Sequence, residues 1–247
     1  MRCKAARSRN ESRAYGDRRM TQRVGIRRLR LLDGAAAANG AAVIIDVLRA
    51  ATTVAYAIAG GAARVVLVES ADRARELRSS RFPNALLAGE VDGAKIPDFD
   101  FDNSPTQMET ATLRGRDLIL RTSSGTQGVM AARKADAVFL AGFVTAAATA
   151  RALRAGPHVA SLVAMGERGL LPAEEDEACA AYIESLLRGR ALPAAALVAD
   201  VRKRLSRDHP APTWLQDVER SFAVDHFDFA IAVSRQDGAA VAGPDRA

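Results

Sequence analysis

The amino-acid sequence predicts an α/β fold in which helices cover both faces of a mainly parallel sheet. From residue 41 onward, short runs rich in Val, Ile and Leu recur, and each is followed by a polar or glycine cluster and an Ala-rich segment. Strands buried on both faces give such continuous apolar runs, and alternation of strand and helix is typical of parallel sheets. With 247 residues and 49% hydrophobic content, the chain can bury a sizeable core.

Six apolar runs are the expected strands. They cover residues 42–45, 64–68, 85–88, 117–120, 137–140 and 159–164, and a seventh strand is expected at 227–233. Helices are expected at about 52–60, 70–79, 126–134, 144–155 and 174–189. Residues 91–116 contain Pro97, Pro105 and a polar run, so we expect a long, ordered, functional loop there. Residues 190–225 are expected to form helix and connector, with a turn at Pro210 and Pro212.

The basic charge is concentrated at the N-terminus. Residues 1–30 hold eleven Arg or Lys and two acidic residues, so they carry +9 and the rest of the chain carries −3 of the net +6. We expect residues 1–40 to form a basic tail and lead-in, with residues 1–19 disordered, followed by a single α/β domain at 41–240. Met20 is an alternative start of the chain. Tyr15 alone interrupts the tail with an aromatic ring, so we do not expect nucleic-acid binding.

Composition also argues against a membrane protein and a disulfide-rich protein. The longest largely apolar stretch, residues 138–150, has 13 residues, whereas a membrane-spanning helix needs about 20. The two cysteines, Cys3 and Cys179, do not make a disulfide framework, and no Cys/His spacing fits zinc. We therefore expect a cytoplasmic protein, for which a homo-oligomer is compatible with the sequence.

Polar residues follow the predicted strands, where ligands bind in open α/β sheets. The first strand is followed by Asp46, Arg49, Thr52 and Thr53, and the third strand is followed by Glu90. The fourth strand is followed by residues 122–126. The sixth strand is followed by Gly166 and Glu167 and then by the acidic run 174–177. These groups are expected at one edge of the sheet. Together they would offer carboxylates, one arginine and two hydroxyl-rich turns to a ligand.

Each of these residues also has a structural interpretation. Asp46 ends a buried strand, where a carboxylate is costly unless partnered, so we favour a catalytic or metal-binding role over a helix cap. Arg49 is a candidate anion-binding group, although it could instead pair with Asp46 or Glu69. Thr52 and Thr53 could cap a helix, and a helix start also offers unpaired N–H groups to an anion.

The turn Thr122-Ser123-Ser124-Gly125-Thr126 is typical of an anion-binding loop, because small side chains let the backbone approach a phosphate. No GxxxxGK[ST] or GxGxxG motif is present, which argues against nucleotide-dependent chemistry. The acidic run 174–177 is either a solvated helix start or a source of metal ligands alongside Asp46 or Glu90. Oxygen ligands would select Mg²⁺ or Mn²⁺. The histidines at 158, 209 and 226 are scattered and suggest no catalytic triad.

Taken in order, five segments resemble the 2-phosphosulfolactate phosphatase family. They are IIDVLRAATTVAYAIAGGA (44–62), LLAGEVDGAKIPDFDFDNSP (86–105), LILRTSSGT (118–126), VFLAGFV (138–144) and EEDEACAAYI (174–183). The resemblance implies a three-layer α/β sandwich and a Mg²⁺-dependent hydrolase of phosphoric monoesters. Such an enzyme converts 2-phospho-3-sulfolactate to 3-sulfolactate and phosphate on a route to coenzyme M.

The resemblance also implies roles for particular residues in a reaction that uses a metal-activated water. Asp46, Arg49 and Glu90 are the predicted catalytic residues, and Asp46, Glu90 and Asp176 the predicted Mg²⁺ ligands. The small anionic phosphorylated substrate would be bound by Thr52, Thr53, Asn103, Ser104, Thr122, Ser123, Ser124, Gly125 and Thr126. A covalent aspartyl route is the alternative, but the segment after Asp46 lacks the second Asp of the DxDx[TV] motif.

Some positions depart from the family pattern. Ser124 stands where asparagine is usual and Arg121 where threonine is usual, Asp98 and Asp102 replace small residues, and Ala146 stands where asparagine is common. These changes alter the charge near the expected anion site. Two alternatives therefore stay open: a phosphatase of the same fold that acts on a different phosphorylated hydroxy acid, and a catalytically inactive relative that binds anions.

Overall fold

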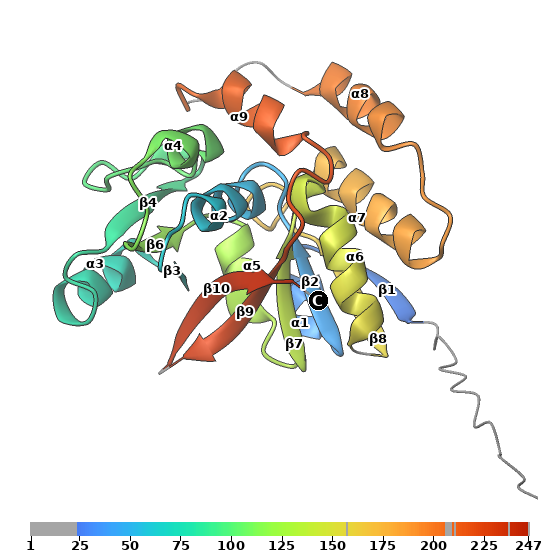
Figure 1. Cartoon of the computed structure of the whole chain (residues 1–247), viewed down its shortest axis with the longest axis horizontal. Coiled ribbons are helices and arrows are strands. Elements are labelled where there is room, and N and C mark those ends of the chain that lie inside the picture. The colour runs from blue at the N-terminus through green and yellow to red at the C-terminus, as the bar shows by residue number, and fades with distance from the viewer. Residues whose placement is uncertain (1–23, 157, 206–208, 210, 237, 247) are drawn as a thin grey trace, which may run out of the picture.

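The computed structural model describes residues 24–156, 158–205, 209, 211–236 and 238–246, and it confirms the predicted α/β fold (Figure 1). Within these residues the strands form one sheet in the order β1-β8-β2-β7-β9-β10-β3-β6-β4-β5. The strands are β1 (Gly25–Arg30), β2 (Ala41–Ile45), β3 (Arg64–Val68), β4 (Leu86–Val91), β5 (Ala94–Lys95), β6 (Asp117–Arg121), β7 (Ala137–Ala141), β8 (Val159–Ala164), β9 (Ala230–Gln236) and β10 (Ala239–Asp245).

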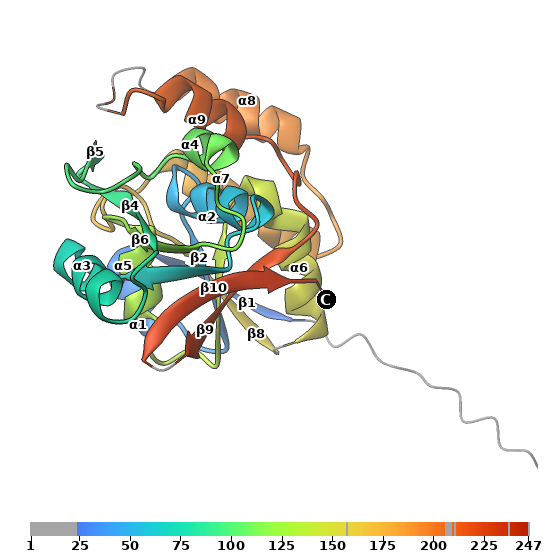
Figure 2. The same ribbon diagram turned by 60° about the vertical axis from the view of Figure 1, so that its left-hand side comes forward.

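Helices lie on both faces of this sheet, which agrees with a three-layer sandwich (Figures 1 and 2). They are α1 (Leu31–Ala37), α2 (Ala50–Ala59), α3 (Ala71–Ser80), α4 (Pro105–Thr110), α5 (Gly125–Ala131), α6 (Ala146–Ala155), α7 (Glu174–Leu187), α8 (Ala194–Arg204) and α9 (Trp214–Ser221), with a 3₁₀ turn η1 at Phe143–Thr145. None of the described helices is long and apolar enough to span a bilayer.

The sheet consists of two parallel groups joined by a hairpin. Strands β1, β8, β2 and β7 are parallel, and so are β3, β6 and β4. The hairpin of β9 and β10 lies between them and pairs antiparallel with β7 on one side and with β3 on the other. Three consecutive antiparallel pairings leave the two groups running in opposite directions along the sheet.

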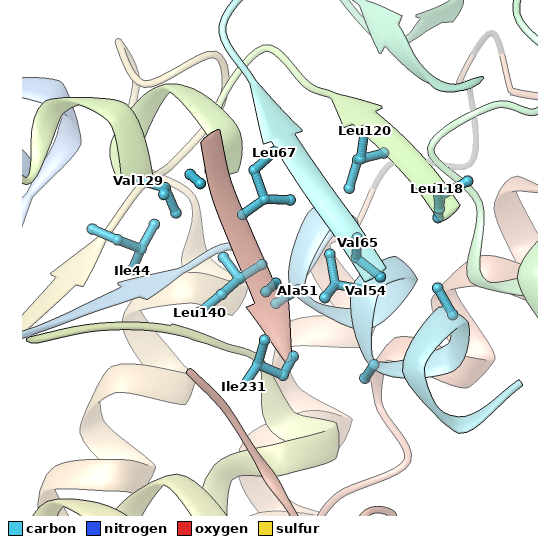
Figure 3. Packing of buried hydrophobic residues seen from close by; sticks show 14 of the residues in the cluster. Ile44, Ala51, Val54, Val65, Leu67, Leu118, Leu120, Val129, Leu140 and Ile231 are labelled. Atoms are coloured by element: carbon cyan, nitrogen blue, oxygen red, sulfur yellow. The ribbon is translucent and has the colours of Figure 1, made fainter. Parts of the chain in front are cut away.

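Side chains alternate between the two faces of each strand, as the period of two requires. On β2, Ile44 joins the core around α2 and α5, whereas Val43 and Ile45 join the core against α6 and α7. Helix α2 is buried from Ala50 to Ala57. Figure 3 shows side chains of both parallel groups, among them Ile44 beside Val129 of α5 and Leu67, in one cluster with Ala51 and Val54 of α2. The all-apolar strand runs of the sequence thus reflect burial on both faces.

Several elements lie where the sequence predicted none. The expected loop 91–116 contains β5 and α4, and α4 starts at Pro105 behind Ser104, whose side chain accepts a hydrogen bond from the Gln107 N–H. The basic lead-in contains β1 and α1, and β10 follows the predicted seventh strand. β1 is an edge strand paired with β8 alone among the described strands. Its sequence GIRRLR contains three arginines, so it lacks the continuous apolar run by which other strands were predicted. β10 contains Gly243 and Pro244, which are uncommon in strands.

The division into a basic segment and one domain at 41–240 stays a prediction, although β1 and α1 join the sheet ahead of residue 41. The expected disorder of residues 1–19 lies outside the described residues, as does Pro210 of the expected turn. Pro212, the other proline of that turn, lies between α8 and α9.

Gly128 lets α5 pack closely on β2, and we expect Gly128→Val to destabilise the fold. A Cβ atom there would lie 2.5 Å from Met165 Sδ and 2.9 Å from Ile44 Cγ2, both fully buried. Overpacking of this kind typically costs about 1–3 kcal/mol. Urea unfolding would show a lower midpoint for Gly128→Val. Gly243→Val is the control, because a Cβ atom at Gly243 meets nothing within 4 Å. Equal midpoints for the two variants would contradict this account of the packing.

Candidate active site

A cavity of about 270 Å³ lies where the turns after β2, β4, β6 and β8 meet. We call it the strand-end cavity. It is lined by Asp46, Leu48, Arg49, Glu90, Asp92, Gly93, Asn103, Ser123, Ser124, Gly166, Glu167, Arg168 and His209. The structure therefore brings together the acid after the first predicted strand and the hydroxyl-rich turn after the fourth. The catalytic and binding roles assigned to these residues stay predictions.

Asp46 is held where β2 meets α2. It is buried, and its Oδ1 accepts a hydrogen bond of 3.1 Å from the Ala50 N–H. Its Oδ2 lies against Gly125, where a Cβ atom would come within 2.7 Å of that oxygen. Burial raises the pKa of Asp46 to about 6, the Ala50 N–H opposes this shift, and the negative charge of Glu90 adds to it. A glycine at 125 is therefore needed for Asp46 to occupy this position.

The Asp176 side chain bridges the segments that follow β2 and β8. Its Oδ1 accepts from the Val47 N–H and its Oδ2 from the Gly166 N–H, both at 2.8 Å. Burial raises the pKa of Asp176 well above its ordinary value, and the charges of Glu175 and Asp46 raise it further. Burial also raises the pKa of Glu175 to about 7, with Asp46 contributing repulsion. Three carboxyl groups that repel one another thus meet beside the cavity.

Glu90 fixes the position of the turn after β6. Its carboxylate accepts hydrogen bonds from the Ser123 N–H at 2.6 Å, the Ser123 hydroxyl at 3.0 Å and the Gly93 N–H at 2.8 Å. Ser124 donates to the Gly166 carbonyl at 2.7 Å. Thr122 and Thr126 bond each other reciprocally through backbone N–H and hydroxyl groups. Of these four hydroxyl residues, Ser123 and Ser124 line the cavity.

Three other predicted substrate-binding residues do not line the strand-end cavity. Thr52 donates to the Val47 carbonyl at 3.0 Å, and the buried hydroxyl oxygen of Thr53 has no hydrogen-bond partner among the described residues. Ser104 caps α4 and donates to Asp217 at 2.7 Å. Each side chain is buried within or at the start of a helix, and the substrate-binding role of these residues stays a prediction.

Arg49 lines the cavity, but its guanidinium group is paired with two buried carboxylates. It bonds Asp102 through two nitrogen atoms, at 3.0 and 3.2 Å, and Asp217 at 3.0 Å. Arg49 is 3% exposed, so this cation is already neutralised out of reach of bulk water. Its partners are neither Asp46 nor Glu69, the alternatives considered from the sequence. Its predicted role in anion binding has no support from this geometry.

Several residues of the site were not predicted. Glu175 was predicted only as part of the acidic run 174–177, Asp217 and Arg168 had no predicted role, and the histidines, His209 among them, were too scattered to suggest a triad. Arg168 is half-exposed on the turn after β8, with Asp92 at 3.6 Å and Glu167 at 3.5 Å. No local signal marks these residues, because the cavity gathers them from segments far apart in the chain. The departure at Asp102 was the one hint of the ion pair with Arg49.

The strand-end cavity contains oxygen donors of the kind that Mg²⁺ prefers. Asp46 lines it, and so does Asn103, whose buried Oδ1 has no hydrogen-bond partner among the described residues. No group of three or more His, Cys, Asp or Glu side chains in the described ranges is arranged to hold a metal ion. Mg²⁺ is commonly bound by one or two carboxylates, together with water and substrate phosphate. Asp46 and Asn103 fit such a site. Glu90 also lines the cavity, and the roles of Glu90 and Asp176 as Mg²⁺ ligands stay predictions.

We expect Asp46→Asn to have a higher free energy of unfolding than the wild-type protein without metal, by an amount that grows as the pH rises. The pKa of Asp46 is about 6 in the folded protein and about 3.9 in an unfolded chain, so the folded state binds more protons between these values. Wild-type stability should therefore fall as the pH increases through this window. Asparagine removes that charge and should gain about 2–3 kcal/mol near neutral pH.

Urea unfolding in EDTA at about pH 5 and about pH 8 tests this expectation. Asp92→Asn is the matched control, because Asp92 also lines the cavity but is exposed. A pH dependence of Asp46→Asn that parallels wild type would show that Asp46 is not the charge responsible.

The two arginines of the cavity should respond differently to substitution by methionine. Arg49→Met leaves Asp102 and Asp217 buried without their cation, which should cost about 3–5 kcal/mol. Arg168→Met removes a half-exposed cation and should change stability by no more than about 0.5 kcal/mol. Chemical unfolding of both variants measures the difference. A small loss for Arg49→Met would argue against the buried network as a structural element.

Comparison with known proteins shows which family the sequence matches. The family model for 2-phosphosulpholactate phosphatase matches residues 28–221. A "Probable 2-phosphosulfolactate phosphatase" of Bacillus subtilis (strain 168) is 36% identical over 150 residues, which cover 60% of this chain and 64% of the relative. A protein of the same name from Deinococcus radiodurans is 36% identical over 148 residues, 59% of this chain and 61% of the relative.

A third relative, the "Probable 2-phosphosulfolactate phosphatase" of Symbiobacterium thermophilum, is 39% identical over 117 residues, 47% of this chain and 50% of that protein. The matched part therefore spans less than two thirds of each of these relatives. The family model, in contrast, covers most of the chain, including every residue that lines the strand-end cavity. The chain belongs to the 2-phosphosulfolactate phosphatase family.

Proposed function

We propose that this chain is a Mg²⁺-dependent phosphatase that hydrolyses 2-phosphosulfolactate to 3-sulfolactate and phosphate. The observation that carries the proposal is the meeting of Asp46 with the Ser123–Ser124 turn in one cavity, within a chain of this family. A phosphoric monoester hydrolase needs a carboxylate to hold a cation or a proton beside polar groups that hold phosphoryl oxygens. Membership of the coenzyme M route is part of the same proposal, and the cytoplasmic location stays a prediction.

The charge balance of the cavity supports the requirement for a divalent cation. Among the described residues, four carboxylates line it, from Asp46, Glu90, Asp92 and Glu167. Of the two described arginines that line it, Arg49 is neutralised by Asp102 and Asp217, and Arg168 is a single cation against these four carboxylates. A substrate with phosphate, carboxylate and sulfonate groups would be repelled by this surface. When bound, Mg²⁺ would supply positive charge to the phosphoryl oxygens.

The residues of the chain divide the remaining tasks. Asp46 and Asn103 would hold the cation, and Ser123, whose position Glu90 fixes, would hold a phosphoryl oxygen. Arg168 offers a half-exposed cation for a second anionic group of the substrate. Water attacks phosphorus, the ester P–O bond breaks, and the leaving alkoxide takes up a proton to give the hydroxy acid.

Phosphate release from 2-phosphosulfolactate, measured with Mg²⁺ and with EDTA, tests the proposal. We expect Mg²⁺-dependent turnover that Asp46→Asn lowers by at least about a hundredfold. Parallel assays on other phosphorylated hydroxy acids separate the alternatives. Turnover of those compounds alone would overturn the sulfolactate assignment and support a different phosphatase of this fold. Phosphate binding without turnover of any ester would indicate an inactive anion-binding relative.

A further inference from the structure

His209 lines the strand-end cavity from the segment between α8 and α9. Figure 1 shows α8 and α9 together on one side of the molecule, above α2. The residue also lines the adjoining cavity of about 470 Å³, which shares Leu48, Gly166 and Glu167 with the first. His209 therefore stands where the two cavities join.

The protonation of the His209 ring is set by a backbone contact. Its Nδ1 accepts a hydrogen bond of 3.1 Å from the Ala211 N–H. An imidazole nitrogen that accepts a hydrogen bond carries no proton, so in the neutral ring the proton lies on Nε2. No partner for Nε2 is present among the described residues. The ring thus has one hydrogen-bond donor to offer and cannot act as a base through Nε2.

The ring is also held in a fixed orientation. It stacks on the indole of Trp214, with centroids 4.0 Å apart and planes inclined by 8°. Trp214 is the first residue of α9, and α9 is fastened by Asp217, which is fully buried and bonds Arg49, Ser104 and Thr213. Because the network that holds α9 also includes Arg49, three residues after Asp46, the positions of His209 and the β2 turn are coupled.

We propose that His209 is a substrate-binding residue that donates a hydrogen bond from Nε2–H, as a neutral imidazole, to an oxygen of the bound phosphorylated anion. This inference rests on the proposed function of the cavity. No proton is transferred, so His209 acts by stabilising oxygen charge and the hydrolysis itself is unchanged. A preorganised donor of this kind contributes most where charge develops in the transition state.

The electrostatic surroundings are consistent with a neutral ring. Burial lowers the pKa of His209 and the positive charge of Arg49 lowers it further, against the opposing charges of Asp102, Glu90 and Asp217. A neutral donor has an advantage in this cavity, because the binding of the anion then requires no accompanying uptake of a proton by the ring.

Two substitutions of His209 separate its donor from its structural contact. In His209→Asn, the amide oxygen takes the place of Nδ1 and can accept from the Ala211 N–H, but no group replaces Nε2. In His209→Gln, the amide nitrogen reaches the place of Nε2 and restores a donor. We expect His209→Asn to lower kcat/KM by about a hundredfold and His209→Gln to remain within about tenfold of wild type. His226→Gln is the matched control, since His226 stacks on Tyr56 and does not line either cavity.

Titration calorimetry with inorganic phosphate and Mg²⁺ provides a readout that does not depend on turnover. Weaker phosphate binding by His209→Asn, restored by His209→Gln, supports the inference even if no ester is hydrolysed, in which case the proposed function alone fails. Wild-type turnover and binding in His209→Asn overturn the inference and leave the proposed function standing. Equal losses in both His209 variants also overturn it, because they indicate a structural role.

The tautomer is tested directly by a long-range ¹H–¹⁵N correlation spectrum of the full chain near neutral pH. The His209 signals, assigned by their loss in His209→Gln, should show the pattern of a neutral ring protonated at Nε2. The pattern of an imidazolium, or of a ring protonated at Nδ1, would overturn the inference.

Discussion

The buried guanidinium group of Arg49 is the interaction on which the arrangement of the site depends. It binds Asp102 from the segment after β4 and Asp217 from α9. One cation between two carboxylates leaves a net negative charge, which is stabilised by hydrogen bonds from Ser104, Thr106 and Thr213 to Asp217. A buried charge is tolerated only when it is paired and hydrogen-bonded in this way. Through this network, the β2 turn, the start of α4 and the whole of α9 are held in one arrangement.

The neutralisation of Arg49 has an electrostatic consequence for the cavity. Burial raises the pKa values of Asp46, Glu175 and Asp176 beside it, and the negative charge of Asp46 adds to the shifts of the other two. Arg49, which is paired with Asp102 and Asp217, opposes the shift of Asp46. A fold optimised for stability alone would replace or pair such groups. Their accumulation is typical of a functional site, where unfavourable charge in the free protein is relieved by a ligand of opposite charge. The proposed affinity of the cavity for Mg²⁺ therefore has the same cause as the repulsion among its carboxylates, because a bound cation would relieve that repulsion.

The sequence predicted those parts of the site whose signal is local. Asp46 was found because a carboxylate directly after a buried apolar run is unusual, and the turn 122–126 because its composition suits an anion. The partners of Arg49 were missed, because they lie 53 and 168 residues away in the chain. Glu175 and Asp176 are neighbours on α7, and only the position of that helix decides that Asp176 bonds two backbone N–H groups. His209 carries no local signal for the same reason, because only the fold places it against Trp214 and in the lining of the cavity.

We expected Asp46 to meet the turn after β6 because both follow strands of a mainly parallel sheet. Strand direction alone does not explain this meeting. In a flat sheet of this order, the β9–β10 hairpin would place the carboxyl ends of β2 and β6 at opposite edges. Five strand-to-strand steps separate β2 from β6, and a twist of about 20–25° at each step turns the two strands relative to one another by about 100–125°. The sheet thereby curves around α2, whose residues from Ala50 to Ala57 are buried within it (Figure 2). This curvature brings Gly125 against Asp46, so the site depends on sheet twist as well as on strand order.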